Sequence, residues 1–143
     1  MRQEWSSNWV RSVQPRKQRK YRYNAPQHVR KAFLSVHLSK ELRAKYGIRS
    51  LVARKDDSVE VMRGTSKGLR GKIARVDTKN SAVYIEGIAV KKVSGTEAMK
   101  PIKASNVRLI DLYLEDKQRA AKLNRLAVAA NKAKAAATVG DKK

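Results

Sequence analysis

SVEVMRGTSKGLRGKIARVDTKNSAVYIE, residues 58–86, contains three short apolar segments separated by a glycine-rich loop and a polar turn. Valines at 59 and 61 flank a glutamate, and this alternation with a period of two is typical of a half-buried strand. The apolar pattern resumes at residues 73–76 and again at 83–85. Residues 77–81 are rich in Asp, Asn and Ser, which favour turns. We therefore predict three consecutive strands.

The loop between the first two strands combines glycine with basic side chains. Glycine adopts positive φ and permits close backbone approach, so this loop can lie against a bulky partner such as a phosphate backbone. The candidate residues are Gly64, Gly68 and Gly71 for the backbone and Arg63, Lys67, Arg70 and Lys72 for the charge. The alternative reading is that the glycines serve only the turns of the fold.

The composition points to a polyanionic partner. Among 143 residues there are 34 Lys plus Arg against 12 Asp plus Glu, a formal net charge of +22. Such an excess repels itself in a free globule, so nucleic acid is the first candidate partner and an anionic membrane surface the second. No apolar run approaches the ~20 residues that span a bilayer, so no membrane insertion is expected. The absence of cysteine excludes disulfides and thiolate metal sites.

The N-terminal segment is basic and contains no acidic residue from Trp5 to Lys40. Basic side chains interleaved with tyrosines suit RNA, because the cations neutralise phosphates and the rings stack on exposed bases. The candidates are Arg11, Arg16, Lys17, Arg19, Lys20, Tyr21, Arg22, Tyr23, Arg30 and Lys31. We predict that residues 1–23 are disordered in the free protein and become ordered on RNA. Trp5 and Trp9 belong either to a loose leader or to a stacking or docking contact.

Helices are expected on both sides of the strands. A short helix begins at Asn24-Ala25-Pro26, and its apolar side is assigned to Val29, Phe33, Leu34 and Val36. A second helix covers residues 40–46, with Ser39 as its N-cap and Gly47 at its end. Glu115 and Asp116 open a C-terminal helix whose Ala/Lys-rich continuation beyond Leu126 is expected to fray or to be disordered. Asp56-Asp57-Ser58 is interpreted as a turn rather than a metal site.

Several quoted segments together resemble one known family. They are the loop with its flanking strands, PRKQRK at 15–20, NAP at 24–26, LSKELR at 38–43, RKDD at 54–57 and SNV at 105–107. The pattern resembles the archaeal and eukaryotic branch of the universal large-subunit ribosomal protein L-twenty-four family, called L-twenty-six in eukaryotes, whose loop is a KOW motif. The resemblance extends roughly from Pro15 to Leu126. The family often has His-Pro before Ser-Asn-Val, where this chain has Lys103-Ala104.

The predicted fold class is mainly β. A small SH3-like β-barrel (the KOW domain) carries a basic N-terminal arm, two short N-terminal helices and a C-terminal helix or tail. The predicted boundaries are 1–23 for the arm, 24–55 for helices and linker, 56–114 for the barrel, and 115–143 for the C-terminal helix and tail. Within the barrel, Lys91 and Lys92 precede a hairpin turn and are further RNA candidates, and Asn106 is a structural loop residue.

The resemblance implies a structural constituent of the large ribosomal subunit in the cytoplasm. Its partners would be large-subunit ribosomal RNA, bound at its 5′ region near the polypeptide exit tunnel, and neighbouring large-subunit proteins; it would also support subunit assembly. His28 and His37 are isolated and the acids sit at turns or helix starts, so no enzyme, catalytic residue, metal, cofactor or small-molecule substrate is expected.

Two other functions account for part of the sequence pattern. A KOW-type transcription elongation factor carries a separate α/β domain, which does not precede Ser58 here. A chromatin or nucleoid DNA binder would account for the charge, but not for the arm, the glycine loop and Ser-Asn-Val together.

Overall fold

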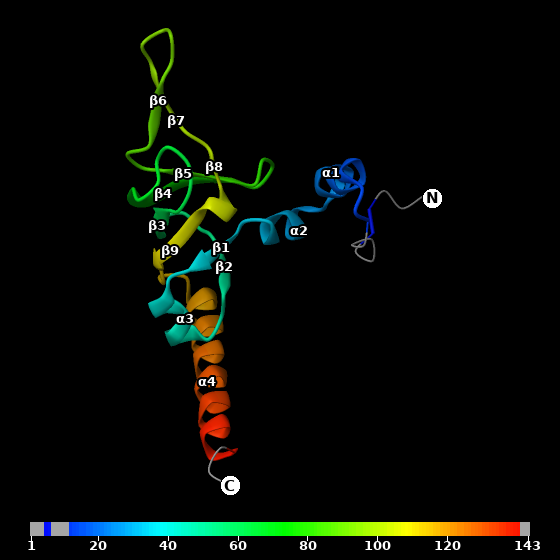
Figure 1. The fold of residues 1–143 in the computed structure, drawn as a ribbon, viewed down its shortest axis with the longest axis vertical. Helices are drawn as coiled ribbons and strands as arrows, with labels where there is room; N and C mark the ends of the chain where they lie inside the picture. The colour runs from blue at the N-terminus through cyan, green and yellow to red at the C-terminus, as the bar shows by residue number, and fades with distance from the viewer. Residues whose placement is uncertain (1–4, 7–11, 141–143) are drawn as a thin grey trace.

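The computed structural model describes residues 5–6 and 12–140. The helices are α1 (Pro15–Asn24), α2 (Gln27–Ala32), α3 (Lys40–Tyr46), η1 (Ala104–Asn106) and α4 (Lys117–Gly140). The strands are β1 (Ser35–Leu38), β2 (Ser50–Val52), β3 (Ser58–Val61), β4 (Arg70–Asp77), β5 (Ala82–Ile85), β6 (Ala89–Lys91), β7 (Glu97–Met99), β8 (Ile102–Lys103) and β9 (Val107–Asp111). Three parts project from a central sheet: α1 with α2, the β6–β7 hairpin, and α4 (Figure 1). No helix in the described part of the chain is both long and apolar enough to cross a bilayer.

Seven strands form one sheet in the order β2-β1-β9-β3-β4-β5-β8, and β6 pairs with β7 separately. β1 runs parallel to β9, whereas the other neighbouring strands are antiparallel. β9 therefore joins the β1–β2 pair to the hairpin that carries the glycine loop. The predicted strands around this loop are confirmed as β3, β4 and β5.

The mainly β class is confirmed, but the barrel does not close. Within the described residues the sheet ends at β2 on one side and β8 on the other, and these two strands do not pair. β8 is only two residues long, because the chain then turns into η1 to reach β9. A register shift between Ile73 and Arg75 marks a bulge in β4, and bulges bend a strand and increase its twist.

One apolar cluster fills the interior. It follows the period of two along the strands, since Val59 and Val61 on β3 are buried while the intervening Glu60 is only half-buried. The other buried strand residues include Val36, Leu38, Ile73, Val83, Ile85, Val107 and Leu109. Tyr46 of α3 and Leu123 of α4 complete the cluster. Helices α3 and α4 therefore cover one end of the sheet.

The glycines of the predicted loop serve two different structural needs. Gly64 and Gly68 have φ values of 94° and 86°, which L side chains rarely adopt. Gly71 lies within β4, and a Cβ there would come within 2.8 Å of both the Glu86 carbonyl oxygen and Ile85 Cγ2. Its lack of a side chain permits close packing between the strand and the segment after β5.

Helix α3 follows its prediction residue by residue. The Ser39 hydroxyl accepts a hydrogen bond from the Leu42 N–H at 3.2 Å, and Gly47 ends the helix with φ of 68°. Gly47 also faces α4, because a Cβ there would lie 2.3 Å from Ala130 Cβ. This glycine therefore allows α3 and α4 to pack closely.

The segment before α3 differs from its prediction. Val36 was assigned to the apolar side of a helix, but α2 ends at Ala32 and Val36 is buried in β1. The β-branched Val36 suits a pleated surface that pairs on both edges, with β2 and β9. Residues 24–55 thus contribute two strands to the same sheet as the glycine loop.

The basic arm is also more ordered than predicted, since residues 15–24 form a helix. Pro15 stands in its first turn, and the Lys, Arg and Gln residues that follow are good helix formers. The Trp5 ring lies 5.2 Å from the Tyr21 ring, which lies 6.4 Å from Phe33. Trp5 therefore has a contact within the protein, whereas Trp9 lies outside the described residues.

Helix α4 continues through the Ala/Lys-rich segment to Gly140 and is held to the sheet by a buried ion pair. Arg119 Nη1 and Nη2 donate to the two Asp57 carboxylate oxygens at 2.6 and 2.8 Å, and the side chains are 5% and 0% exposed. The same carboxylate accepts the Arg54 and Tyr113 N–H groups at 2.8 and 3.0 Å. The predicted turn before β3 is confirmed, whereas its partner Arg119 on α4 was not predicted.

Candidate nucleic-acid interface

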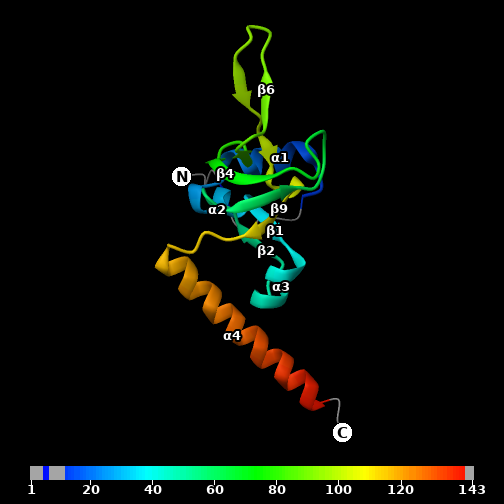
Figure 2. The ribbon, with the colours of Figure 1, turned by 90° about the vertical axis from the view of Figure 1, so that its left-hand side faces the viewer.

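The predicted RNA-binding residues of the described chain lie in three places: on helices α1 and α2, on the β3–β4 loop with the start of β4, and in the β6–β7 hairpin (Figure 1). Those with exposed side chains are Arg16, Lys17, Arg19, Lys20, Arg22, Tyr23, Lys31, Arg63, Lys67, Arg70, Lys72, Lys91 and Lys92. Tyr21 and Arg30 are half-buried, and Arg11 lies outside the described residues. The hairpin and α4 project in different directions in both views (Figures 1 and 2).

Within the arm, the half-buried Tyr21 and Arg30 make contacts inside the protein, whereas Tyr23 is exposed to a partner. Arg30 Nε donates to the Ala25 carbonyl at 2.8 Å, and its Nη2 donates to the Tyr23 carbonyl. Arg30 therefore holds α2 against the end of α1. The Tyr21 ring packs between Trp5 and Phe33, whereas Tyr23 is 74% exposed and available for stacking.

The β3–β4 loop is closed by its own backbone. The Gly68 N–H donates to the Val61 carbonyl at 2.8 Å, and the Lys67 N–H donates to the Gly64 carbonyl at 3.1 Å. Lys100 Nζ donates to the Thr65 hydroxyl at 2.8 Å, which joins the loop to the base of the β6–β7 hairpin. This bonding presents the loop's exposed cations from a defined backbone. Asn106 supports the same strand end, because its carbonyl accepts the Met62 N–H at 2.8 Å.

One of the predicted cations, Arg70, lies close to a carboxylate of the protein itself. Arg70 Nε lies 3.9 Å from a Glu60 carboxylate oxygen, and Arg108 Nη2 donates to the other at 2.5 Å. The hydrogen bond from Arg108 holds the pKa of Glu60 below its ordinary value, with the nearby Arg charges adding to it against the effect of desolvation. Lys67 and Lys72 have no such carboxylate partner among the described residues.

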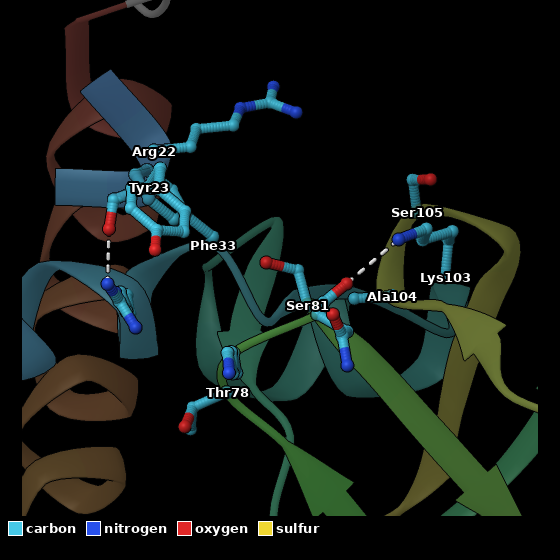
Figure 3. Close-up of a pocket in the computed structure, with 11 residues that line it drawn as sticks. Arg22, Tyr23, Phe33, Thr78, Ser81, Lys103, Ala104 and Ser105 are labelled. Atoms are coloured by element: carbon cyan, nitrogen blue, oxygen red, sulfur yellow. Dashed lines mark hydrogen bonds between the residues drawn. The ribbon is translucent and has the colours of Figure 1, made fainter. Parts of the chain in front are cut away.

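The arm and the sheet enclose an open groove of about 600 Å³ (Figure 3). One wall comes from the arm, a second from the turn between β4 and β5, and a third from the end of β8 and η1. The lining residues are Arg22, Tyr23, Arg30, Phe33, Thr78, Lys79, Asn80, Ser81, Lys103, Ala104 and Ser105. They include four cations and no carboxylate.

Hydrogen bonds fix the sheet side of this groove. The Asp77 carboxylate accepts the Lys79 and Asn80 N–H groups at 2.9 and 3.1 Å and the Asn80 side-chain amide at 2.8 Å. The hydrogen bond from the Asn80 side-chain amide holds the pKa of Asp77 below its ordinary value. Lys103 Nζ donates to the Asn80 carbonyl at 2.8 Å and so links two walls (Figure 3).

Comparison with known proteins places the chain. A family model covering eukaryotic ribosomal proteins L26 and their archaeal L24 counterparts matches residues 12–126. The chain belongs to this family. Relatives named large ribosomal subunit protein uL24 include those of Methanospirillum hungatei (49% identical over 80% of this chain and 96% of the relative) and Methanocella arvoryzae (47%, 81% and 94%). The uL24 of Korarchaeum cryptofilum is 46% identical over 83% of this chain and 91% of its own length.

Membership in this ribosomal protein family confirms the resemblance that the loop and the other quoted segments carry together, and with it the expectation that the chain is not an enzyme. The family match, residues 12–126, covers α1, α2, the whole seven-stranded sheet and the first part of α4. Among the described residues, no group of three or more His, Cys, Asp or Glu side chains is arranged to hold a metal ion.

Sequence reasoning missed two cations that the fold of this family member brings to the groove, Lys79 and Lys103. Lys79 was part of a predicted turn, and Lys103 was noted only as a departure from the usual family pattern. A basic residue at the tip of an exposed turn is a weak signal on its own. Its position opposite the arm depends on how α2 and β1 connect, which the local sequence does not indicate.

Proposed function

We propose that this protein is a structural constituent of the large ribosomal subunit in the cytoplasm. It binds large-subunit ribosomal RNA at the 5′ region, near the polypeptide exit tunnel, and supports subunit assembly. The observation that carries the proposal is the set of exposed cations on the arm and the β3–β4 loop, in a chain that belongs to a ribosomal protein family.

The exposed cations act by neutralising phosphates. Each Lys or Arg that contacts a phosphate releases condensed counterions, which is a favourable, sequence-independent contribution to binding. The arm extends away from the sheet (Figure 1), so α1 can reach RNA on one side while the loop contacts RNA elsewhere. The protein thereby holds separate RNA segments in a fixed relation, which is a structural role.

Neighbouring large-subunit proteins are the second class of partner. The β6–β7 hairpin supports this, since Val90, Val93 and Met99 are exposed apolar side chains on a segment with no buried strand residue. Because Val90 pairs with Ala98 and Met99 with Ala89, these two side chains lie on opposite faces of the hairpin, and each face offers an apolar contact to a neighbouring protein. Lys91 and Lys92 on the same hairpin would contact RNA beside such a protein.

Sedimentation of an extract from the source cells tests the proposal. The protein should co-migrate with the large subunit through a sucrose gradient and remain there at moderate salt. Cross-linking of the purified subunit should then join the arm to the 5′ region of the large-subunit RNA. Co-migration with RNA polymerase would favour an elongation factor, and co-migration with chromosomal DNA would favour a DNA binder; either result contradicts the proposal.

A further inference from the structure

The groove between the arm and the β4–β5 turn has the features of a ligand site rather than of a packing gap. It is lined by three segments distant in sequence, residues 22–33, 78–81 and 103–105 (Figure 3). Its volume of about 600 Å³ lies within the range of small-ligand pockets. Its arm wall contributes the aromatic residues Tyr23 and Phe33 and the other walls are mostly polar, so a ligand would find both stacking and hydrogen-bonding partners.

Hydrogen bonds within the protein already hold the arm side and the sheet side of the groove in place. On the arm side, Arg30 bonds the carbonyls of Tyr23 and Ala25 and so fixes the corner between α1 and α2. On the sheet side, Lys103 Nζ donates to the backbone carbonyl of Asn80, and the side-chain amide of Asn80 donates to the Asp77 carboxylate. A site whose groups are held in place loses less entropy on binding.

The cations that are not used to hold the walls indicate an anionic ligand. Arg22 and Lys79 form no ion pair within the described residues, and no carboxylate lines the groove. The Arg22 guanidinium lies 6.0 Å from the centre of the Phe33 ring, so a planar cation and a ring stand together at one wall. Arg22 comes from the arm and Lys79 from the β4–β5 turn, so the groove offers an anion cations from two different walls.

Among anionic ligands, the aromatic groups of the groove favour a nucleotide. Tyr23 is 74% exposed at the mouth of the groove, although it carries a large apolar ring. Proteins recognise unpaired RNA bases by stacking them on aromatic or guanidinium planes and by bonding their edges. Here Thr78, Ser81 and Ser105 supply hydroxyls for that purpose. An acidic peptide would use the cations but would leave the exposed ring without a stacking partner.

We propose that this groove binds one unpaired nucleotide of ribosomal RNA, with its base on Tyr23 and its phosphate between Arg22 and Lys79. The inference rests on the proposed RNA-binding function and names the element that the arm recognises. A base inside a continuous helix is already stacked on both faces and cannot stack on Tyr23, so the groove distinguishes irregular RNA from a continuous helix. The arm's remaining exposed cations would then lie along the flanking backbone.

The test uses the full-length protein and two RNA hairpins that differ only in a single bulged 2-aminopurine. The bulged RNA should bind about tenfold more tightly than the flush RNA, and its fluorescence should be quenched on binding. Tyr23→Leu should abolish both the preference and the quenching. Lys79→Gln should weaken binding of the bulged RNA about threefold more than Lys55→Gln, a matched loss of one exposed charge outside the groove. Circular dichroism checks that each variant is folded.

The outcomes separate this inference from the proposed function. If the protein co-migrates with large subunits but binds both hairpins equally, or if Tyr23→Leu keeps the quenching, the inference is wrong and the function stands. If it does not co-migrate, the proposed function fails first. Tight binding of a hexaglutamate peptide that Lys79→Gln weakens and Tyr23→Leu does not, without any preference for the bulge, would assign the groove to a protein partner and overturn the inference.

Discussion

Replacing Arg119 by Met should destabilise the protein more than removal of any exposed cation. Arg119 makes a two-pronged ion pair with Asp57 in a site where both side chains are almost fully buried. Removing one partner of such a pair leaves an uncompensated buried charge, which costs about 3–5 kcal/mol. Because the Asp57 carboxylate keeps its two backbone N–H donors, we expect the lower end, about 3 kcal/mol.

Urea unfolding followed by helical circular dichroism measures this effect. With a slope of about 1.5 kcal/mol per molar urea, the midpoint of Arg119→Met should fall by about 2 M. The control is Arg54→Met, which breaks the Arg54–Asp116 pair whose side chains are 51% and 32% exposed. Exposed pairs contribute about 1 kcal/mol or less, so this midpoint should fall by at most about 0.7 M. Equal shifts for the two variants would refute the buried pair as the anchor of α4.

Three further predictions concern the loop, acid stability and the arm. Gly71→Ala should destabilise the fold by about 2–3 kcal/mol in the same urea assay, because its Cβ would clash with Ile85 and the Glu86 carbonyl. Gly68→Ala has open space around its Cβ and only a positive φ to oppose it, so it should cost about 1 kcal/mol; equal losses for the two variants would contradict this. Hydrogen bonding lowers the pKa of Glu60 in the folded protein, so the ionised side chain stabilises the fold above its ordinary pKa of 4.5, and this stabilisation is lost as the pH falls through the lower folded value. Glu60→Gln should therefore flatten the acid dependence of thermal stability below about pH 4.5; an unchanged profile would count against this prediction. Deleting residues 1–23 removes the five cations expected to contact phosphates, Arg16, Lys17, Arg19, Lys20 and Arg22. The slope of log affinity for irregular RNA against log salt should therefore shrink by roughly 3 to 4, at ~0.7 per contact; a change within about one unit would mean that the arm is not the main phosphate clamp.

Local signals account for the elements that could be predicted from the sequence. Ser39 and Gly47 mark both ends of α3 because a hydroxyl cap and a left-handed glycine satisfy the free backbone groups at a helix terminus. The period of two and the Asp-Asn-Ser turn similarly predict β3, β4 and β5. These signals depend only on residues close together in the chain, so they are readable without tertiary structure.

Elements that depend on distant partners could not be predicted in this way. The four residues of β1 are too few to show a period, and their strand state depends on pairing with β9 about seventy positions later. Asp57 and Arg119 are likewise 62 positions apart. The groove combines three such distant segments, so the sequence indicated Arg22, Tyr23 and Arg30 as RNA candidates and residues 77–81 as a turn, but not that the turn and Lys103 face the arm.

The central position of β9 determines when the protein can finish folding during its synthesis. Until residues 107–111 have been made, β1 and β3 each have a free hydrogen-bonding edge and the interior lacks Val107 and Leu109. Exposed strand edges invite pairing with other chains, and non-local pairing is slow to form. A nascent chain of this protein is therefore vulnerable to aggregation until most of its length has been synthesised. Its large positive charge offers protection in that interval, because incomplete chains repel one another.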